Sequence, residues 1–307
     1  MKFSFTLVCF FLVFTINAQK VPKVAYGTIE RIDSLPSNYV APRNIDVWLP
    51  EDYSTENSYD VIYMHDGQML FDSTTTWNKQ EWGVDETISK LVNEGKIREC
   101  IVVGIWNGQK LRHFEYFPQK AFETISQHKR DSLYNDILQN DRGFKGVVMQ
   151  SDNYLKFLVK ELKPLIDKRY ATRPGKEHTF IAGSSMGGLI SMYAICEYPE
   201  VFQGAACIST HWPGLYSLEN NPIPDAFLNY LHKSLPDPKS NKLYFDHGTE
   251  TLDALYPAIQ KQADSILKSK GFKEKNWITR VFEGADHSEN AWKKRFEVPL
   301  LFLLGYE

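Results

Sequence analysis

The stretch His178–Leu189, with the sequence HTFIAGSSMGGL, decides which fold the chain is expected to adopt. Residues 183–187 within it read GSSMG and match the pattern G-x-S-x-G. An apolar run with strand character precedes the match, and apolar residues at helical spacing follow it. A strand, a sharp turn and a helix in this order are the setting of a nucleophile elbow, which holds its central serine above the edge of a sheet. This context predicts that Ser185 is a nucleophile.

The turn around Ser185 also supplies other groups that such chemistry needs. The glycines at positions 183 and 187 leave room for the backbone of a tight turn. The backbone N–H of Met186 comes at the start of the following helix, where the helix dipole favours developing negative charge. We therefore expect Met186 to provide one donor of an oxyanion hole.

Strand and helix patterns alternate on both sides of this turn. Short apolar, β-branched and aromatic runs predict strands at Tyr26–Ile32, Asn44–Leu49, Asp60–His65, Cys100–Trp106, His178–Ala182, Ala205–Ser209, Lys242–Phe245 and Trp277–Phe282. Helical spacing of apolar residues predicts helices at Val84–Val92, Leu155–Leu165, Leu252–Ile266 and Ala291–Leu304. The alternation predicts an α/β fold with a mostly parallel central sheet and helices on both faces. The stretches 109–148 and 212–239 break it and are expected to be irregular lids or binding loops.

Composition and the N-terminus limit the class of protein. Residues 1–18 combine Lys2, an apolar run and a small residue before Gln19, which is typical of a secretory signal peptide cleaved near Ala18. Residues 19–307 are then expected to form a single exported domain. Residues 19–307 contain no apolar run long enough to span a membrane. The net charge of −3 without a basic stripe disfavours nucleic-acid binding.

A serine nucleophile needs a base and an acid that orients the base. His287 follows the last predicted strand and is the candidate base. Since chain order in such sites is Ser, acid, His, the segment 243–253 (LYFDHGTETLD) should supply the acid. Asp253 is favoured, Glu250 is the alternative, and Asp246 is placed last because it lies at the strand end. Asp253 has the competing interpretation of a charge at a helix start.

The remaining candidates surround the predicted nucleophile. The loop after the strand Asp60–His65 contains Gly67 and Gln68, whose backbone should provide the second oxyanion donor. Trp106, Trp212 and Arg112 are candidates for the wall of the substrate pocket, because aromatic rings at a cleft suit a sugar, aryl or other cyclic substrate. The sequence has no His/Cys cluster with metal-ligand spacing and no phosphate-binding glycine loop, so neither a metal nor a cofactor is expected.

The residues as a set resemble the Putative esterase family, which takes in enterochelin-esterase-like hydrolases, feruloyl and acetyl-xylan esterases, S-formylglutathione hydrolases and mycolyltransferases. The segments that carry the resemblance are YMHDGQMLFD, EWGVDE, IVVGIWN, IAGSSMGG, YFDHGTETLD and GADHSENAWKKR. The resemblance implies an α/β-hydrolase fold and an ester hydrolase with a Ser–acid–His triad. It maps the nucleophile onto Ser185, the base onto His287 and the oxyanion amides onto Met186 and the Gly67–Gln68 region.

The favoured interpretation is a secreted serine carboxylic ester hydrolase that acts through an acyl-enzyme on a small-molecule or glycan ester. The ester is expected to be carbohydrate-linked, of the aryl type or of the siderophore type. Two alternatives remain at this stage. An acyltransferase would pass the acyl group to a sugar hydroxyl instead of water, and a non-catalytic binding protein would retain only the fold.

Overall fold

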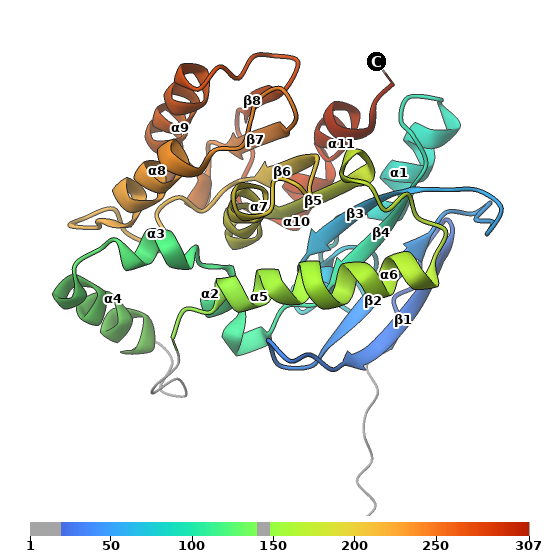
Figure 1. Cartoon of the computed structure of the whole chain (residues 1–307), viewed down its shortest axis with the longest axis horizontal. Helices are drawn as coiled ribbons and strands as arrows, with labels where there is room; N and C mark the ends of the chain where they lie inside the picture. The colour runs from blue at the N-terminus through green and yellow to red at the C-terminus, as the bar shows by residue number, and fades with distance from the viewer. Residues whose placement is uncertain (1–19, 140–147, 307) are drawn as a thin grey trace, which may run out of the picture.

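The computed structural model describes residues 20–139 and 148–306 and is built around one eight-stranded sheet (Figure 1). The strands lie in the order β1-β2-β4-β3-β5-β6-β7-β8. Their bounds are β1 Thr28–Leu35, β2 Arg43–Leu49, β3 Asp60–His65, β4 Cys100–Ile105, β5 Thr179–Ser184, β6 Gly204–Ile208, β7 Lys242–Gly248 and β8 Trp277–Phe282. β1 and β2 are antiparallel to their neighbours, whereas β3 to β8 are parallel. The predicted α/β fold with a mostly parallel sheet is confirmed.

The parallel part of the sheet determines where a site can form. All six residues of β3, β4 and β5 are buried, as expected for apolar strands covered on both faces. The carboxyl ends of parallel strands meet at one edge of the sheet, where ligands bind in open α/β sheets. The loops after β3, β5, β7 and β8 therefore come together at that edge, although they are far apart in the sequence.

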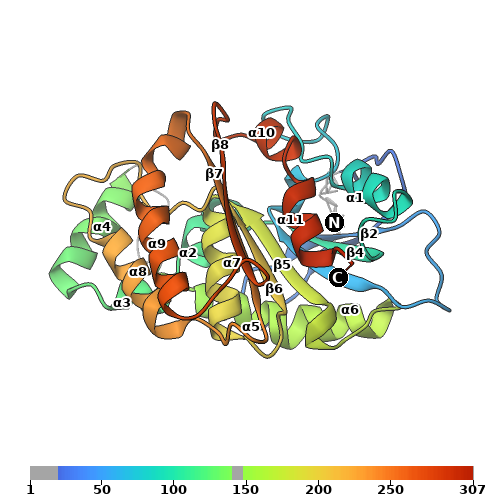
Figure 2. The ribbon, with the colours of Figure 1, turned by 90° about the horizontal axis from the view of Figure 1, so that it is seen from above.

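Helices cover the two faces of the sheet in separate layers. Apolar residues of α1 (Val84–Asn93), α10 (Glu289–Lys293) and α11 (Glu297–Leu304) form one buried cluster with one face. The other face packs against the five helices α5 Ser151–Phe157, α6 Lys163–Arg169, α7 Met186–Glu197, α8 Ile223–Ser234 and α9 Pro257–Ser269. Figure 2 shows α1 and α11 on one side of the strands and α8 and α9 on the other.

The two stretches expected to be irregular contain helices, so that expectation is wrong for the helical residues, whereas residues 212–222 are irregular as expected. Stretch 109–148 forms η2 (Gln109–Leu111), α2 (Arg112–Tyr116), α3 (Gln119–Glu123) and α4 (Gln127–Gln139), and its residues 140–147 lie outside the described residues. Stretch 212–239 contains α8, which begins just after Pro222. Proline is tolerated in the first turn of a helix because its missing N–H has no partner there. The predicted signal peptide, residues 1–18, also lies outside the described residues.

Three predicted helices are interrupted. The Leu155–Leu165 stripe runs through α5, one π-helical turn η3 (Leu158–Leu162) and α6. The Leu252–Ile266 stripe is divided into η5 (Thr251–Leu255) and α9, with Pro257 at the start of α9. The Ala291–Leu304 segment is divided into α10 and α11. Short turns η1 (Gly67–Met69) and η4 (Lys176–His178) precede α1 and β5.

The three cysteines in the described part of the chain are all free thiols. Cys100 in β4 and Cys207 in β6 are buried in the core, and Cys196 in α7 is partly buried. Burial raises the pKa of each of these thiols. None of the helices in the described part of the chain has the length and apolar content that crossing a bilayer requires.

Candidate active site

The turn between β5 and α7 has the strained geometry of an elbow. Ser185 has φ 58° and ψ −121°, a backbone conformation that residues with a side chain rarely adopt. Gly183 has no room for a side chain, since an added Cβ would lie 2.8 Å from the carbonyl group of Gly187. Ser185 N–H donates to the Ile208 carbonyl at 2.9 Å, and His211 N–H donates to the Ser185 carbonyl at 3.2 Å. The loop after β6 therefore holds the turn in place.

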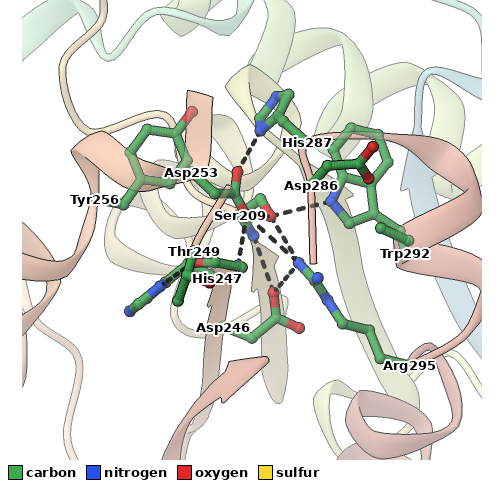
Figure 3. A network of polar contacts seen from close by, with 12 residues as sticks. Ser209, Asp246, His247, Thr249, Asp253, Tyr256, Asp286, His287, Trp292 and Arg295 are labelled. Atoms are coloured by element: carbon green, nitrogen blue, oxygen red, sulfur yellow. Dashed lines mark hydrogen bonds and ion pairs between the residues drawn. The ribbon is translucent and has the colours of Figure 1, made fainter. Parts of the chain in front are cut away.

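The loops after β7 and β8 bring Asp253 and His287 together (Figure 3). Nδ1 of His287 lies 2.5 Å from Oδ1 of Asp253, whose side chain is fully buried. Because an ionised carboxylate only accepts hydrogen bonds, Nδ1 carries the proton and Nε2 is left to accept one. Burial alone would raise the pKa of Asp253, but the hydrogen bonds and charge of His287, together with those from Ser209 and Gly248, lower it.

The other two acids considered in the sequence lie elsewhere. Glu250 is exposed, and its backbone N–H donates to the Ala285 carbonyl at 3.1 Å. Asp246 is fully buried within β7, which continues to Gly248 instead of ending at Asp246 as expected, and pairs with Arg295 at 3.0 Å. Burial raises the pKa of Asp246. Of the three acids, only Asp253 is hydrogen-bonded to the His287 ring.

Backbone and hydroxyl contacts fix the register of the two loops. The N–H groups of Thr249 and Glu250 donate to the same carbonyl, that of Ala285. The Thr249 hydroxyl accepts from Gly284 N–H at 2.8 Å, and the Thr251 hydroxyl accepts from His287 N–H at 2.9 Å. Since β7 and β8 are adjacent parallel strands, these contacts extend their pairing beyond the sheet and hold the histidine beside the acid.

Ser209 lies at the centre of a buried network that sequence analysis missed (Figure 3). Its hydroxyl oxygen is 2.6 Å from Asp253 Oδ2, 3.0 Å from Trp292 Nε1 and 2.7 Å from Arg295 Nη2. The indole and guanidinium groups can only donate, so they occupy the two lone pairs and the hydroxyl proton must point to Asp253. Gly248 N–H donates to the same carboxylate oxygen at 2.5 Å. Ser209 therefore orients the acid.

Two further residues next to Ser185 were also missed. Tyr256 is fully buried, and its hydroxyl lies 2.9 Å from Nδ1 of His211. The neighbouring Ser185 influences the pKa of this hydroxyl, which burial raises. The ring centroid of Tyr256 lies 5.9 Å from that of His287. Burial lowers the pKa of His211 to about 3, and the neighbouring His287 lowers it further, so His211 is neutral near pH 7. Tyr256 thus lies against both the elbow serine and the histidine.

The loop after β3 lies against the elbow from the opposite side. Asp66 has φ 56° and comes directly before η1, which contains Gly67 and Gln68. Oδ2 of Asp66 would be 3.4 Å from a Cβ added to Gly187. Gln68 and Met186 both lie in the first turn of a helix, where backbone N–H groups have no partner within the helix. These are the positions where the sequence predicts the oxyanion donors.

An ion pair holds this loop. Arg112 Nε and Nη2 donate to the two oxygens of Asp66, each at 2.7 Å, and Asn107 Nδ2 donates to Oδ1 at 2.7 Å. Burial would raise the pKa of Asp66, but the charge and hydrogen bonds of Arg112 lower it. The pair keeps Asp66 ionised in its left-handed conformation.

A cavity of about 810 Å³ opens at the elbow. Its lining includes Ser185, Met186, Arg112, His113, His211 and Tyr216. Nε2 of His113 is buried and has no hydrogen-bond partner among the described residues. Burial lowers the pKa of His113 to about 4, and the charge of Arg112 contributes.

The three predicted pocket residues lie in three different places. Arg112 lines the 810 Å³ cavity. Trp212 does not line it, because its ring is fully buried, stacks on Phe245 and donates through Nε1 to Gln260 at 2.8 Å. Trp106 lines a second, smaller hollow, which shares Gln109 with the first cavity. Within residues 20–139 and 148–306, no cluster of three or more His, Cys, Asp or Glu side chains could hold a metal ion.

A sequence model of the family described as "Putative esterase" matches residues 38–141 and 147–303. The protein YbbA of Bacillus subtilis is 25% identical over 89% of this chain and 96% of its own length. An endo-1,4-beta-xylanase/feruloyl esterase of Xylanibacter ruminicola is 24% identical over 89% of this chain. The match spans only 31% of that second, longer protein.

Solved structures share the fold. The ferulic acid esterase of Anaeromyces mucronatus superposes with a TM-score of 0.61 and 20% identity, covering 92% of each chain. The enterobactin esterase of Shigella flexneri gives a TM-score of 0.64 at 14% identity, covering 92% of this chain and 60% of that one. At these identities the likeness concerns the architecture alone, and it agrees with the sheet order described above.

Proposed function

The chain belongs to the Putative esterase family, and on that premise we propose that it is a serine carboxylic ester hydrolase with Ser185, His287 and Asp253 as its triad. The observation that carries the proposal is the 2.5 Å contact between His287 Nδ1 and Asp253 Oδ1 at the edge of the sheet where the elbow lies. A histidine held in this tautomer has Nε2 available as a general base.

The proposed reaction has two stages. Ser185 Oγ attacks the ester carbonyl carbon while its proton moves to His287 Nε2. The backbone N–H groups of Met186 and Gln68 stabilise the resulting oxyanion. The tetrahedral intermediate then collapses to an acyl-enzyme, and the leaving alcohol takes the proton from His287. A water molecule, deprotonated by His287, releases the acid and restores Ser185.

The cavity supports an acyl group that carries a polar substituent. Its wall combines apolar side chains, such as Phe114 and Leu133, with charged side chains, such as Lys110 and Arg112. A hydroxylated aromatic acyl group would fill a cavity of this size and find both apolar contacts and polar partners on its wall. The names of relatives with feruloyl esterase and enterobactin esterase activity are consistent with such a substrate.

We also propose that residues 1–18 are a signal peptide and that residues 19–307 act as one exported domain. The support is the pattern of Lys2, an apolar run and a small residue before Gln19. Expression of the full chain with its leader should give a protein that starts near Gln19 outside the cytoplasm. An intact Met1 on an exported protein, or retention in the cytoplasm, would contradict this.

The test of the triad is Ser185→Ala beside the matched variant Ser184→Ala. Loss of a nucleophile typically lowers kcat by about 10⁴-fold or more, so Ser185→Ala should lose hydrolysis of aryl esters and labelling by a fluorophosphonate probe. Ser184 lies in β5 and is buried, and its variant should keep both. Near-wild-type turnover in folded Ser185→Ala protein, or equal losses in both variants, would overturn the assignment.

A further inference from the structure

A second hollow lies beside the predicted oxyanion loop and takes no part in the proposed chemistry. It has a volume of about 370 Å³, within the range of about 300–1,000 Å³ that is usual for ligand sites. Gln109 borders both this hollow and the cavity at Ser185. Gln68, whose backbone we propose as an oxyanion donor, lies on its wall. The two spaces therefore share a wall residue beside the predicted oxyanion loop.

Two indole rings dominate the wall of the second hollow. Trp77 is 83% exposed, an unusual state for so large an apolar side chain. Trp106 is held rigidly, because its Nε1 donates to Asp46 at 2.7 Å and the Arg31 guanidinium lies 4.6 Å from its ring centroid. The two rings line the same hollow, one exposed and one fixed, and aromatic faces of this kind suit a flat, weakly polar ligand.

The rest of the wall carries hydrogen-bonding groups without net negative charge. It consists of Lys20, Gln68, Thr74, Thr75, Thr76, Asn107 and Gln109. Asn107 N–H donates to Gln68 Oε1 at 3.2 Å. The other end of that amide, Nε2 with its two N–H donors, therefore remains for a ligand. The Thr75 hydroxyl donates to the Asp72 carbonyl at 2.8 Å and keeps its acceptor lone pairs. Indole faces combined with neutral amides and hydroxyls match a ring that has apolar C–H faces and equatorial hydroxyls.

We propose that this hollow binds a sugar ring on the alcohol side of the ester, so that the acyl group enters the cavity at Ser185 and the sugar stacks on Trp77. The inference rests on the proposed function, since it takes the two spaces as the two arms of one ester substrate. It narrows the substrate class to esters of a glycan hydroxyl. Trp77 is then a specificity-determining residue.

Direct binding tests the site without catalysis. The full chain carrying Ser185→Ala is titrated with the methyl glycosides of xylose, arabinose, glucose and galactose and followed by saturation-transfer NMR and indole fluorescence. At least one glycoside should bind, and adding Trp77→Ala should weaken its binding by about tenfold, the size of one aromatic contact. Tyr306→Ala, which removes a 64%-exposed aromatic side chain at the C-terminus, should leave the binding unchanged.

Kinetics then connect the site to the substrate. The ratio of kcat/KM for a sugar-linked ester to that for the methyl ester of the same acid should fall about tenfold in Trp77→Ala and stay constant in Tyr306→Ala. The inference is overturned if no glycoside binds, if Trp77→Ala leaves the binding unchanged, or if the ratio of the two kcat/KM values is unchanged in Trp77→Ala. Failure of the proposed function would look different, because wild-type protein would then hydrolyse neither ester while glycoside binding could still be measured.

Discussion

Ser209→Ala is expected to weaken both the stability and the turnover of this protein. The hydroxyl donates to the carboxylate of Asp253 and accepts from Trp292 and Arg295. A hydrogen bond to a charged group contributes about 1.5–3 kcal/mol, and leaving the buried indole N–H of Trp292 without a partner costs about 1–3 kcal/mol. Arg295 keeps Asp246 at 3.0 Å. The free energy of unfolding should therefore fall by about 3–5 kcal/mol.

The effect on turnover follows from the same contacts. Oδ2 of Asp253 would keep only the N–H of Gly248 as a close donor, so the carboxylate gains freedom to rotate away from His287. Misplacement of a catalytic group by about 1 Å can cost on the order of 10²-fold in rate. We expect kcat to fall by that order while KM changes little, because Ser209 is fully buried and does not line the cavity. Urea unfolding and steady-state kinetics on an aryl ester measure the two effects.

Ser151→Ala is the matched control. Ser151 is also fully buried, and its hydroxyl oxygen accepts from Gln119 N–H at 2.9 Å at the start of α5. This variant should lose stability but keep kcat, because the contact is separate from His287 and Asp253. If Ser209→Ala retains wild-type kcat, or if Ser151→Ala loses as much turnover at equal stability, Ser209 does not position the acid.

Two more outcomes are expected. Asp253→Asn should lower kcat by on the order of 10⁴-fold because it favours the wrong imidazole tautomer, whereas Glu250→Gln should keep most activity; steady-state rates showing the reverse would move the acid to Glu250. Burial lowers the pKa of His65 and of His211 to about 3 and that of His113 to about 4, below the ordinary value of about 6.5. Because the unfolded chain then binds more protons, the free energy of unfolding should fall by about 2 kcal/mol per imidazole as the pH is lowered from 7 to 5. Urea unfolding at both pH values should show about a third of this combined loss removed in His211→Gln and none removed in the Gln variant of the exposed His232, and equal losses in all three proteins would refute the reasoning.

The strands β2 to β7 were predictable because nearly all their residues are buried on both faces, whereas the edge strands β1 and β8 are more exposed. β3 and β8 have the predicted bounds, and the other six strands differ by a few residues at their ends. The short helices α2, α3 and α4 were not predictable from periodicity. Buried aromatic residues on several sides, such as Phe114, Tyr116 and Phe117, leave no single apolar stripe to recognise.

The site was predictable only where local sequence determines it. The elbow is a continuous strand, turn and helix, so its pattern could be recognised. Ser209 contacts Asp253, Trp292 and Arg295 across 44 to 86 residues of chain, and no spacing pattern in the sequence indicates such contacts. Trp212 illustrates the same limit, because only its stacking on Phe245 and its bond to Gln260 show that it lies in the core.

The backbone angle of Ser185 sets activity and stability against each other at a single position. A residue with a side chain held at φ 58° and ψ −121° costs of the order of 1–3 kcal/mol, and glycine would adopt the same turn with little strain. Selection for stability alone would therefore favour glycine at this position. If Ser185 is the nucleophile, as proposed, selection for function has maintained a less stable turn, and stabilising substitutions elsewhere in the sheet could be tolerated without relaxing it.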